Sequence, residues 1–503
     1  MKELKTTLLL VCLLLLSACG NRQVDNKVKS ASDLKGAVIG VQLGTTSDVL
    51  STQLEQKGEG TKVERFTKSA DAVQALRQGK IDCMVEDEQP AKAFLRQNKS
   101  LRILPDVFGS SGLAIVVAKE NDQLQTDINT AIQKLKEDGT IDSIVNRHID
   151  QQVKVAYQST QSEALQKENL AKGKVIRFAT NATFEPFEYY ADGKIVGIDV
   201  DVAKAICDVL HMNAEIVDME FDAIIASVQT GKADAGIAGI TVTPERKKNI
   251  NFSESYTDVK QVIIVNAGGV VKNDQGLVEQ FKNCFVKDHR YNYLLKGLGN
   301  TLIITIFAIM LSLMLGTLIA IVRATHERNG NLKMLNALCQ VYLTIIRGTP
   351  TMVQLLIIYY VVFASADVNK LVVAIIAFGL NSAAYIAEVI RSGILSVDMG
   401  QMEAGRSLGL SYSQSMRFVI LPQAFKNVLP AIGNELITLL KETSISGYIG
   451  LVDLTKGSDI IRSITYEAML PLGVVALIYL SIVLTLAFGV NRMEKRLRKS
   501  ERK

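Results

Sequence analysis

Residues able to do covalent or metal chemistry are scattered along this sequence instead of forming a motif. Six cysteines occur, with no C-x-x-C pair and no His/Cys cluster, so isolated thiols are expected and a structural metal is not. Gly231-Lys232 lacks the leading glycine and the hydroxyl residue of a nucleotide-binding P-loop. We therefore predict no metal, no cofactor and no ATP hydrolysis by that motif. We expect the chain to bind a ligand and to dock to a partner protein.

A short charged stretch between two strongly apolar segments has residue types that suit docking to a partner protein. It reads Gln401-Met402-Glu403-Ala404-Gly405-Arg406-Ser407-Leu408-Gly409 and continues to Val419-Ile420-Leu421-Pro422. The pattern predicts a short helix from Glu403 to Leu408, ended by Gly409, and a break at Pro422. A short helix held by tight turns can sit in a cleft of a partner and transmit force.

This stretch resembles the EAA loop of the permeases of bacterial ABC importers. In that loop E-A-A is followed by a glycine four residues after the second alanine, and later by I-x-L-P. Here Gly405 stands for the second alanine and Val419 for the isoleucine. The resemblance implies that Glu403, Ala404, Gly405 and Gly409 couple the chain to a separate, dimeric ABC ATPase. The alternative is an ordinary polar loop between membrane helices.

Length and composition predict two kinds of domain. A chain of 503 residues is too long for one domain. Hydrophobic residues make up 48%, but the long apolar runs lie between Asn300 and Val490, while the first half is mixed and charged. The net charge of +5 is modest, and basic residues crowd near the ends of apolar segments instead of forming a nucleic-acid patch. We expect a soluble half followed by a membrane half.

The N-terminus has the pattern of a secretory leader. Lys2 and Lys5 precede an apolar run that ends in L-S-A-C at Cys19. This ending resembles a bacterial lipobox, which implies a lipidated Cys19 anchored to membrane lipid. The alternative is an uncleaved signal anchor. In both cases the residues that follow face outward.

Two stretches alternate strand and helix signals, which predicts mostly parallel sheets. The first runs from Asp33 to Asp150 and includes the short β-branched run Ala37–Val41. The second begins at Lys174, with a strand at Val175–Ala179. Between them, Gln158–Gly173 is polar without strong periodicity and indicates a linker.

Both stretches resemble parts of type II periplasmic solute-binding proteins for amino acids. T-N-A-T-F-E-P-F-E, G-I-D-V-D, F-D-A-I-I, G-I-T-V-T-P-E-R and F-S-E-S-Y look like the first lobe of that family. G-V-Q-L-G-T-T, D-C-M-V-E-D and L-A-I-V-V-A-K-E look like the second lobe and the return to the first. The family starts with the material placed here at Lys174, so the order is circularly permuted.

Permutation leaves two arrangements open. In the one we favour, both lobes assemble within one chain, and a single crossing near Gly112 joins them. In the other, two half-domains pair between chains. The first is favoured because half-domains expose sheet edges and apolar faces.

The resemblance assigns residues to the two charged groups of an amino-acid ligand. A carboxylate needs a fixed cation, and Arg246 supplies a bidentate fork. Thr241 and Thr46 add donors to the same group. Asp87 and the carbonyl of Gly239 match the acceptors of the ligand ammonium.

The resemblance also implies which residues meet the ligand side chain. Phe184 and Phe221 match two apolar walls, while Asn181, Gln42 and Glu86 fall where the family contacts the side-chain tip. These tip residues are polar, with one acid and no base, which disfavours glutamate and aspartate. Glutamine is favoured; arginine, lysine and histidine come second because Glu86 can pair with a cation.

The membrane half is expected to contain five spans, at about 300–321, 351–363, 371–389, 428–440 and 471–488. Basic residues after the first span, in the EAA-like loop and in the tail place the binding half outside and the tail in the cytoplasm. L-L-K-G-L-G-N-T-L and I-I-R-G-T-P-T-M-V-Q-L resemble permeases of the His/Gln/Arg uptake family. Lys441 and Glu442 suggest either a translocation path or an interfacial ion pair.

The predicted fold class is therefore an α/β two-lobed type II solute-binding domain in permuted order, followed by an all-α membrane domain with five transmembrane helices. The expected segments are a leader at 1–19, lobe 2 with its return into lobe 1 at 30–155, a linker at 156–173, lobe 1 at 174–266, a connector at 267–294, the permease at 295–491 and a basic tail at 492–503. The resemblance implies a non-enzymatic ABC importer subunit, functioning as a homodimer in the cell membrane. An amino-acid-gated sensor or channel, or an enzyme on the same fold, remains the alternative.

Overall fold

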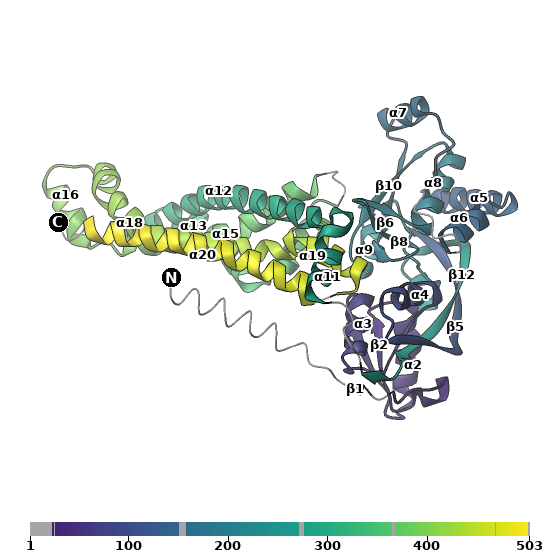
Figure 1. Ribbon diagram of the computed structural model, residues 1–503. Helices are drawn as coiled ribbons and strands as arrows, with labels where there is room; N and C mark the ends of the chain where they lie inside the picture. The colour runs from purple at the N-terminus through teal and green to yellow at the C-terminus, as the bar shows by residue number, and fades with distance from the viewer. Residues whose placement is uncertain are drawn as a thin grey trace. The chain divides into compact units, whose positions relative to one another are not determined.

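The computed structural model describes residues 23–24, 26–149, 157–270, 276–364, 368–467 and 469–500. The expected leader and Cys19 lie outside the described residues. The chain forms two compact units, whose elements are labelled in Figure 1. The sheet unit comprises residues up to Tyr293 together with Ser458–Gly473, and the helical unit comprises Leu294–Gly457 and the chain from Val474 onward.

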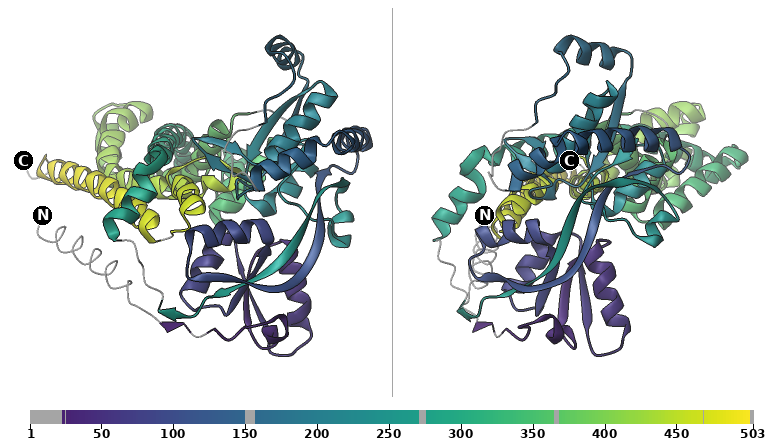
Figure 2. Two further views of the ribbon diagram at one scale, coloured as in Figure 1. Left: turned by 45° about the vertical axis from the view of Figure 1, so that its right-hand side comes forward. Right: turned by 90° about the vertical axis from the view of Figure 1, so that its right-hand side faces the viewer.

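One eight-stranded sheet organises the sheet unit, in the spatial order β10-β6-β11-β5-β12-β4-β2-β3. Its strands are β2 (Val38–Gln42), β3 (Lys62–Phe66), β4 (Cys83–Asp87), β5 (Leu101–Val117), β6 (Val175–Thr180), β10 (Asn213–Asp218), β11 (Ala235–Gly236) and β12 (Asn251–Asn266). Strand β2 pairs in parallel with β3 and β4, and β6 with β10 and β11, as the alternating pattern predicts. The long central strands β5 and β12 are antiparallel and lie side by side (Figure 2).

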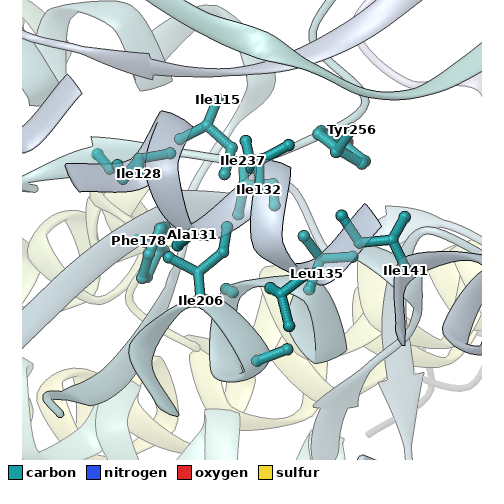
Figure 3. Packing of buried hydrophobic residues seen from close by; sticks show 14 of the residues in the cluster. Ile115, Ile128, Ala131, Ile132, Leu135, Ile141, Phe178, Ile206, Ile237 and Tyr256 are labelled. Atoms are coloured by element: carbon teal, nitrogen blue, oxygen red, sulfur yellow. The ribbon is translucent and has the colours of Figure 1, made fainter. Parts of the chain in front are cut away.

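These two central strands divide the sheet unit into two lobes with separate cores. Lobe 1 is built on β6, β10 and β11, and its core contains Ile115 of β5 and Tyr256 of β12 (Figure 3). Lobe 2 is built on β2, β3 and β4, and its core contains Leu101 of β5 and Ile264 of β12. Both strands therefore pass from one core to the other.

The expectation of a single crossing near Gly112 is thus wrong. The chain after F-S-E-S-Y does not stop in lobe 1: the second half of β12 pairs with β4 of lobe 2, with Gln261 opposite Asp87. Two long strands instead of one join the lobes, and both lobes lie in the same polypeptide.

Amphipathic helices cover the sheet. Those of lobe 2 are α2 (Thr46–Gln56), α3 (Ser69–Arg77) and α4 (Glu88–Gln97), and those of lobe 1 are α5 (Asp122–Glu137), α6 (Thr140–Ile149), α8 (Ile198–Leu210), α9 (Ile224–Gln229) and α10 (Pro244–Lys247). In α5 the buried residues are Ile128, Ala131, Ile132 and Leu135, at the three- and four-residue spacing that puts them on one face. Figure 3 shows these four side chains in the core of lobe 1.

Smaller elements complete the sheet unit. They are the pair β1 (Gln23–Val24) and β13 (Gly269–Val270), the three-stranded sheet of β7 (Thr183–Phe184), β8 (Glu188–Ala191) and β9 (Lys194–Val196), and α11 (Leu277–Phe281). The three-stranded sheet carries a residue of the candidate site at each of its first two strands, Phe184 and Glu188.

The stretch expected to be a linker contains a helix, α7 (Glu163–Ala171). Its N-terminus is capped by Ser162, whose hydroxyl accepts from the Leu165 amide. The Gln161 side chain donates to the backbone carbonyls of Cys207 and Met212 in lobe 1. Capping and side-chain hydrogen bonds stabilise this helix, and neither leaves an apolar periodicity in the sequence.

The helical unit is built from long helices joined by short ones. Its elements are α12 (Tyr291–Asn329), α13 (Lys333–Gly348), α14 (Thr351–Ile357), η5 (Ile358–Val362), α15 (Lys370–Leu395), α16 (Met399–Ser407), α17 (Tyr412–Ser415), η6 (Met416–Ile420), α18 (Leu421–Glu442), η7 (Thr443–Ile449), α19 (Leu454–Thr465) and α20 (Met469–Ser500). The Ser458–Gly473 part of α19 and α20 belongs to the sheet unit.

Three of the described helices are long and apolar enough to cross a membrane: Tyr291–Glu327, Lys370–Leu395 and Met469–Leu497. A fourth candidate is the pair Lys333–Gly348 and Thr351–Val362, bent by 111°. The expected count of five is therefore not confirmed. The remaining expected span falls in α18, where polar residues such as Lys426, Asn427 and Glu435 interrupt the apolar sequence.

Candidate functional site

A small cavity of about 20 Å³ lies where the two lobes of the sheet unit meet. Both lobes contribute to its lining, which consists of Gln42, Thr45, Thr46, Ser47, Glu86, Asp87, Asn181, Phe184, Glu188, Phe221, Ala238, Gly239 and Arg246. Nine of the ten ligand-binding residues predicted from the sequence are in this set. The tenth, Thr241, is not.

The lobe 2 side of the cavity is formed where two parallel strands end. Gln42 ends β2, and Glu86 and Asp87 end β4, so their side chains meet at one edge of the sheet. The chain leaves β2 through a turn at Gly44, whose φ of +76° is in the left-handed region that glycine tolerates. Helix α2 then presents Thr46 in its first turn.

The two adjacent acids of β4 are buried and differ in their hydrogen bonds. Glu86 accepts from the Ser69 hydroxyl and, at 3.0 Å, from the Asp87 amide. Asp87 accepts from the Gln261 side-chain amide at 2.6 Å. Burial, followed by the charge of Asp87, raises the pKa of Glu86 to about 8. Burial raises the pKa of Asp87 to about 6, opposed by the Gln261 hydrogen bond.

At neutral pH these pKa values keep Glu86 protonated and Asp87 ionised. The pair therefore offers two different functions side by side: a neutral carboxyl that can donate and accept, and a carboxylate that can bind an ammonium group.

On the lobe 1 side of the cavity, the aromatic ring of Phe184 packs against the backbone of Gly239. Gly239 has a φ of +55°, and a Cβ there would lie 2.9 Å from the ring of Phe184, so the ring packs directly on the glycine. The Gly239 amide donates to Asp199 at 2.7 Å. Asn181, at the end of β6, donates to the Met219 carbonyl at 2.8 Å.

Arg246 is the cation of the site, and it is half-buried on α10. Its guanidinium donates to the Thr241 carbonyl at 2.7 Å and to the Gly44 carbonyl of lobe 2. It also lies over the ring of Phe221, 5.7 Å from the centroid. Burial lowers the pKa of Arg246 to about 10, so the group stays charged at neutral pH.

Thr241 occupies a supporting position instead of lining the cavity. Its carbonyl accepts from Arg246, and its hydroxyl lies 3.1 Å from that of Ser111 on β5. The structure thus places Thr241 behind Arg246, where it orients the guanidinium.

The sequence analysis missed four lining residues, Thr45, Ser47, Glu188 and Ala238, of which Glu188 is the titratable one. Its side chain is 1% exposed, and its Oε2 atom has no hydrogen-bond partner among the described residues. Burial, followed by the nearby Asp199, raises the pKa of Glu188 well above its usual range. The only available signal was its place in P-F-E-Y-Y, directly after the buried Phe187 at the start of β8.

The residue types of the site suit a small zwitterion, but a cavity of about 20 Å³ holds little more than a water molecule, so an amino acid enters only when the lobes open. The site has one fixed cation, one ionised carboxylate and two aromatic walls, with polar side chains beyond them. Within the described residues, no group of three His, Cys, Asp or Glu side chains is arranged to hold a metal ion.

The EAA-like stretch forms the expected short helix in the helical unit. Helix α16 begins at Met399, four residues earlier than expected, because Asp398 caps it by accepting from the Gly400 amide at 2.7 Å. Gly409, with a φ of +84°, follows the helix end as predicted. Glu403 and Ala404 are exposed, as is the apolar Leu408 at 84%.

Of the four predicted coupling residues, Glu403, Ala404, Gly405 and Gly409, only Gly405 is buried. A Cβ at this position would lie 2.8 Å from the hydroxyl oxygen of Ser415 and 3.2 Å from its Cβ. Glycine therefore lets α16 pack closely against α17, and the exposed face is left to Glu403 and Ala404.

Comparisons with known proteins agree with this division of the chain. Residues 176–299 match the family described as bacterial extracellular solute-binding proteins, family 3. Residues 312–499 match the family described as binding-protein-dependent transport system inner membrane component.

Relatives of the second half are named as amino-acid permeases. The arginine transport system permease protein ArtQ of Bacillus subtilis (strain 168) is 36% identical over 211 residues, which are 42% of this chain and 94% of ArtQ. The putative glutamine transport system permease protein GlnP of Rickettsia prowazekii (strain Madrid E) is 35% identical over 207 residues, 41% of this chain and 93% of that protein.

A solved structure titled "Crystal structure of an amino acid ABC transporter with histidines" is 39% identical over 42% of this chain and 98% of its own, with a TM-score of 0.39. The chain belongs to the family of binding-protein-dependent transport system inner membrane components, as an amino-acid ABC importer permease that carries a solute-binding domain in the same polypeptide.

Proposed function

We propose that this chain binds a polar amino acid, glutamine in the first place, and passes it to its own permease half. The main support for this proposal is that Arg246, Asp87, Phe184 and Phe221, which come from two lobes, line one cavity. Arg246 binds the ligand carboxylate, and Asp87 with the Gly239 carbonyl binds the ammonium. The two rings enclose the side chain.

Glutamine is proposed because of the protonation state of Glu86. A carboxyl with a pKa of about 8 is neutral at pH 7, so it both donates and accepts hydrogen bonds. A carboxamide also does both. Gln42 and Asn181 add further amide groups around the same cavity.

A cationic amino acid such as arginine is the second candidate. Glu86 and Glu188 are two carboxyl groups in the cavity beyond the one that pairs with the ammonium. If a guanidinium enters, it can displace a proton from one of them and form an ion pair. Of the similar permeases, ArtQ is named for arginine transport and GlnP for glutamine transport.

The order of the two lobes is part of the proposal. Lobe 2 precedes lobe 1 in this chain, so we infer a circularly permuted domain of type II. The joining of both lobes by β5 and β12 within one chain supports this reading over half-domains shared between chains.

The partners follow from the helical unit. We propose that the exposed Glu403 and Ala404, with Gly405 and Gly409 shaping the turn, couple the permease to a dimeric ABC ATPase. We propose further that two copies of the chain form the transporter, with the binding lobes outside, the tail from residue 492 in the cytoplasm, and Cys19 lipidated.

Calorimetry of the full chain in nanodiscs against the twenty amino acids tests the proposal. Glutamine is expected to bind most tightly, and the Arg246→Ala variant is expected to bind it much more weakly. Binding of arginine but not glutamine would select the second candidate. Binding of no amino acid would contradict both.

A further inference from the structure

The chain returns to the sheet unit after most of the helical unit has been completed, at Ser458–Gly473. Charged residues of this segment pair with α3 and the residue before it, all in lobe 2. Asp459 accepts from the Lys68 ammonium at 2.5 Å, Arg462 pairs with Asp71, and Glu467 lies 3.6 Å from Arg77.

An aromatic side chain of the segment is built into the core of lobe 2. Tyr466 is 2% exposed and belongs to the same core cluster as Phe94 of α4, with their ring centroids 5.0 Å apart in an edge-on arrangement. Its backbone has a φ of +52°, an uncommon value for a residue with a side chain. The Gln74 side chain donates to the Tyr466 carbonyl, which helps to hold this conformation.

A second backbone carbonyl of the segment is also bound by lobe 2. Gln97 at the end of α4 donates from its side chain to the carbonyl of Ile464 at 2.9 Å. Residues 459–467 thus contact lobe 2 through ion pairs, hydrogen bonds and a buried ring, spread over both α3 and α4. We call these residues the clamp.

The side-chain contacts between the two lobes are polar, and they include the hydrogen bond from Arg246 to the Gly44 carbonyl. Arg96 of lobe 2 pairs with Glu185 of lobe 1 at 2.8 Å, with side-chain exposures of 42% and 29%. Lys68 lies 3.9 Å from Glu220 of lobe 1. The exposed Arg96–Glu185 pair is weak and easily exchanged for water, whereas a ring in a packed core is not. The Lys68–Glu220 pair is largely buried, with side-chain exposures of 10% and 12%, but its 3.9 Å separation is longer than the 2.5 Å between Lys68 and Asp459 of the clamp.

We propose that the clamp holds lobe 2 throughout the transport cycle, so that lobe 1 is the lobe that moves when ligand enters and leaves. The proposal rests on the proposed function in one respect, that ligand closes the lobes. Lys68 gains a role from its position, because it pairs with the clamp through Asp459 and approaches lobe 1 through Glu220. Closure of lobe 1 therefore brings Glu220 to the ammonium group of Lys68, which Asp459 of the clamp already holds in place.

Two matched cross-links test this in the full chain, in a Cys339→Ala background. Gln97→Cys with Ile464→Cys links the clamp to lobe 2, and Arg96→Cys with Glu185→Cys links the two lobes. Each pair is closed with a short, membrane-impermeant cross-linker in vesicles that contain the complete transporter. The readout is uptake of radiolabelled glutamine and of radiolabelled arginine.

The clamp link is expected to leave uptake within about threefold of the same variant before cross-linking, while the lobe link is expected to lower it at least tenfold. Loss of uptake with the clamp link, restored when a cleavable linker is cut, would overturn the proposal, because lobe 2 would then have to leave the clamp. If the untreated parent chain takes up neither probe, the proposed function fails instead, and the second measurement decides on the clamp.

That second measurement is hydrogen exchange, which needs no transport. The backbone amides of residues 459–467 are expected to exchange slowly, and at the same rate with and without glutamine or arginine. Tyr466→Ala is expected to raise their exchange rate at least tenfold. Tyr466→Phe is expected to change it little, since the Tyr466 hydroxyl has no hydrogen-bond partner among the described residues. Fast exchange of the clamp in the unmodified chain would overturn the proposal.

Discussion

Arg246 of lobe 1 donates a hydrogen bond to the carbonyl oxygen of Gly44 in lobe 2. The same guanidinium is held by the Thr241 carbonyl and lies over the Phe221 ring. The residue that supplies the cation of the site is therefore also a direct link between the lobes. Under the proposed function, ligand binding and lobe closure would share this side chain.

Replacing Arg246 by alanine is expected to remove the cation that the ligand carboxylate needs. Truncation of one partner of a buried ion pair costs about 2–5 kcal/mol, which corresponds to a loss of affinity of roughly 30-fold to more than 1,000-fold. Calorimetry with glutamine on the full chain measures this loss of affinity. Lys247→Ala, at an exposed position of the same helix, is the control and is expected to leave affinity unchanged. Unaltered affinity in Arg246→Ala would exclude Arg246 from the ligand site.

The pH dependence of binding separates the two candidate ligands. A cationic side chain needs Glu86 ionised, and the pKa of Glu86 is about 8 in the site, so binding below that pH must release a proton. The affinity for arginine is then expected to rise about tenfold per pH unit as the pH approaches 8. Glutamine makes no such demand, and its affinity is expected to stay level between the pKa of Asp87, about 6, and that of Glu86, about 8, and to fall above pH 8 as Glu86 loses its proton.

Calorimetry in buffers of different ionisation enthalpy counts the released protons directly. Glu86→Gln is the matched variant: it keeps the shape and removes the titration, so any rise toward pH 8 is expected to disappear. A glutamine affinity that rises steeply toward pH 8 would contradict a neutral Glu86 as its partner.

A charge reversal at Glu403 is expected to uncouple the permease from its ATPase. The side chain is exposed on α16, so Glu403→Lys changes the docking face without disturbing the packing of Gly405 behind it. Uptake is expected to fall at least tenfold, with ligand affinity unchanged. Ser413→Lys on the neighbouring α17 is also exposed and serves as the control. Full uptake by Glu403→Lys would show that this loop does not carry the coupling.

The buried member of the motif gives a packing prediction. Gly405→Ala restores the alanine found in the related loop, but its methyl group meets Ser415 at 2.8 Å. Overpacking of this kind costs about 1–3 kcal/mol, so uptake is expected to fall several-fold. Ser415→Ala should recover most of that loss in the double variant, because the Ser415 hydroxyl has no partner among the described residues to lose. If uptake does not recover in the double variant, the strain does not lie in the contact between positions 405 and 415.

The fold was predictable where local pattern and tertiary position agree. The short β-branched run at Ala37–Val41 became β2, shifted by one residue, and the glycine at position 409 ended its helix as expected. The prediction failed for β12, since a strand that serves two cores carries no mark in the sequence of where one lobe ends. It failed for α7 because that helix depends on Gln161 and Ser162 hydrogen bonds to lobe 1 and to its own first turn.

Most of the residues that line the cavity were predicted from the resemblance to type II solute-binding proteins, whose motifs imply a cation, an anion and apolar walls at these positions. The sequence by itself, through that resemblance, placed Arg246, Asp87, Phe184 and Phe221 in one site, and these four residues do line one cavity. It also determined that the chain joins a binding half to a permease half. Only the tertiary structure decided that Glu188 enters the cavity, that burial raises the pKa of Glu86 and that Tyr466 is buried in lobe 2. These properties depend on desolvation by neighbours brought together from distant parts of the chain, and burial of that kind has no local sequence pattern.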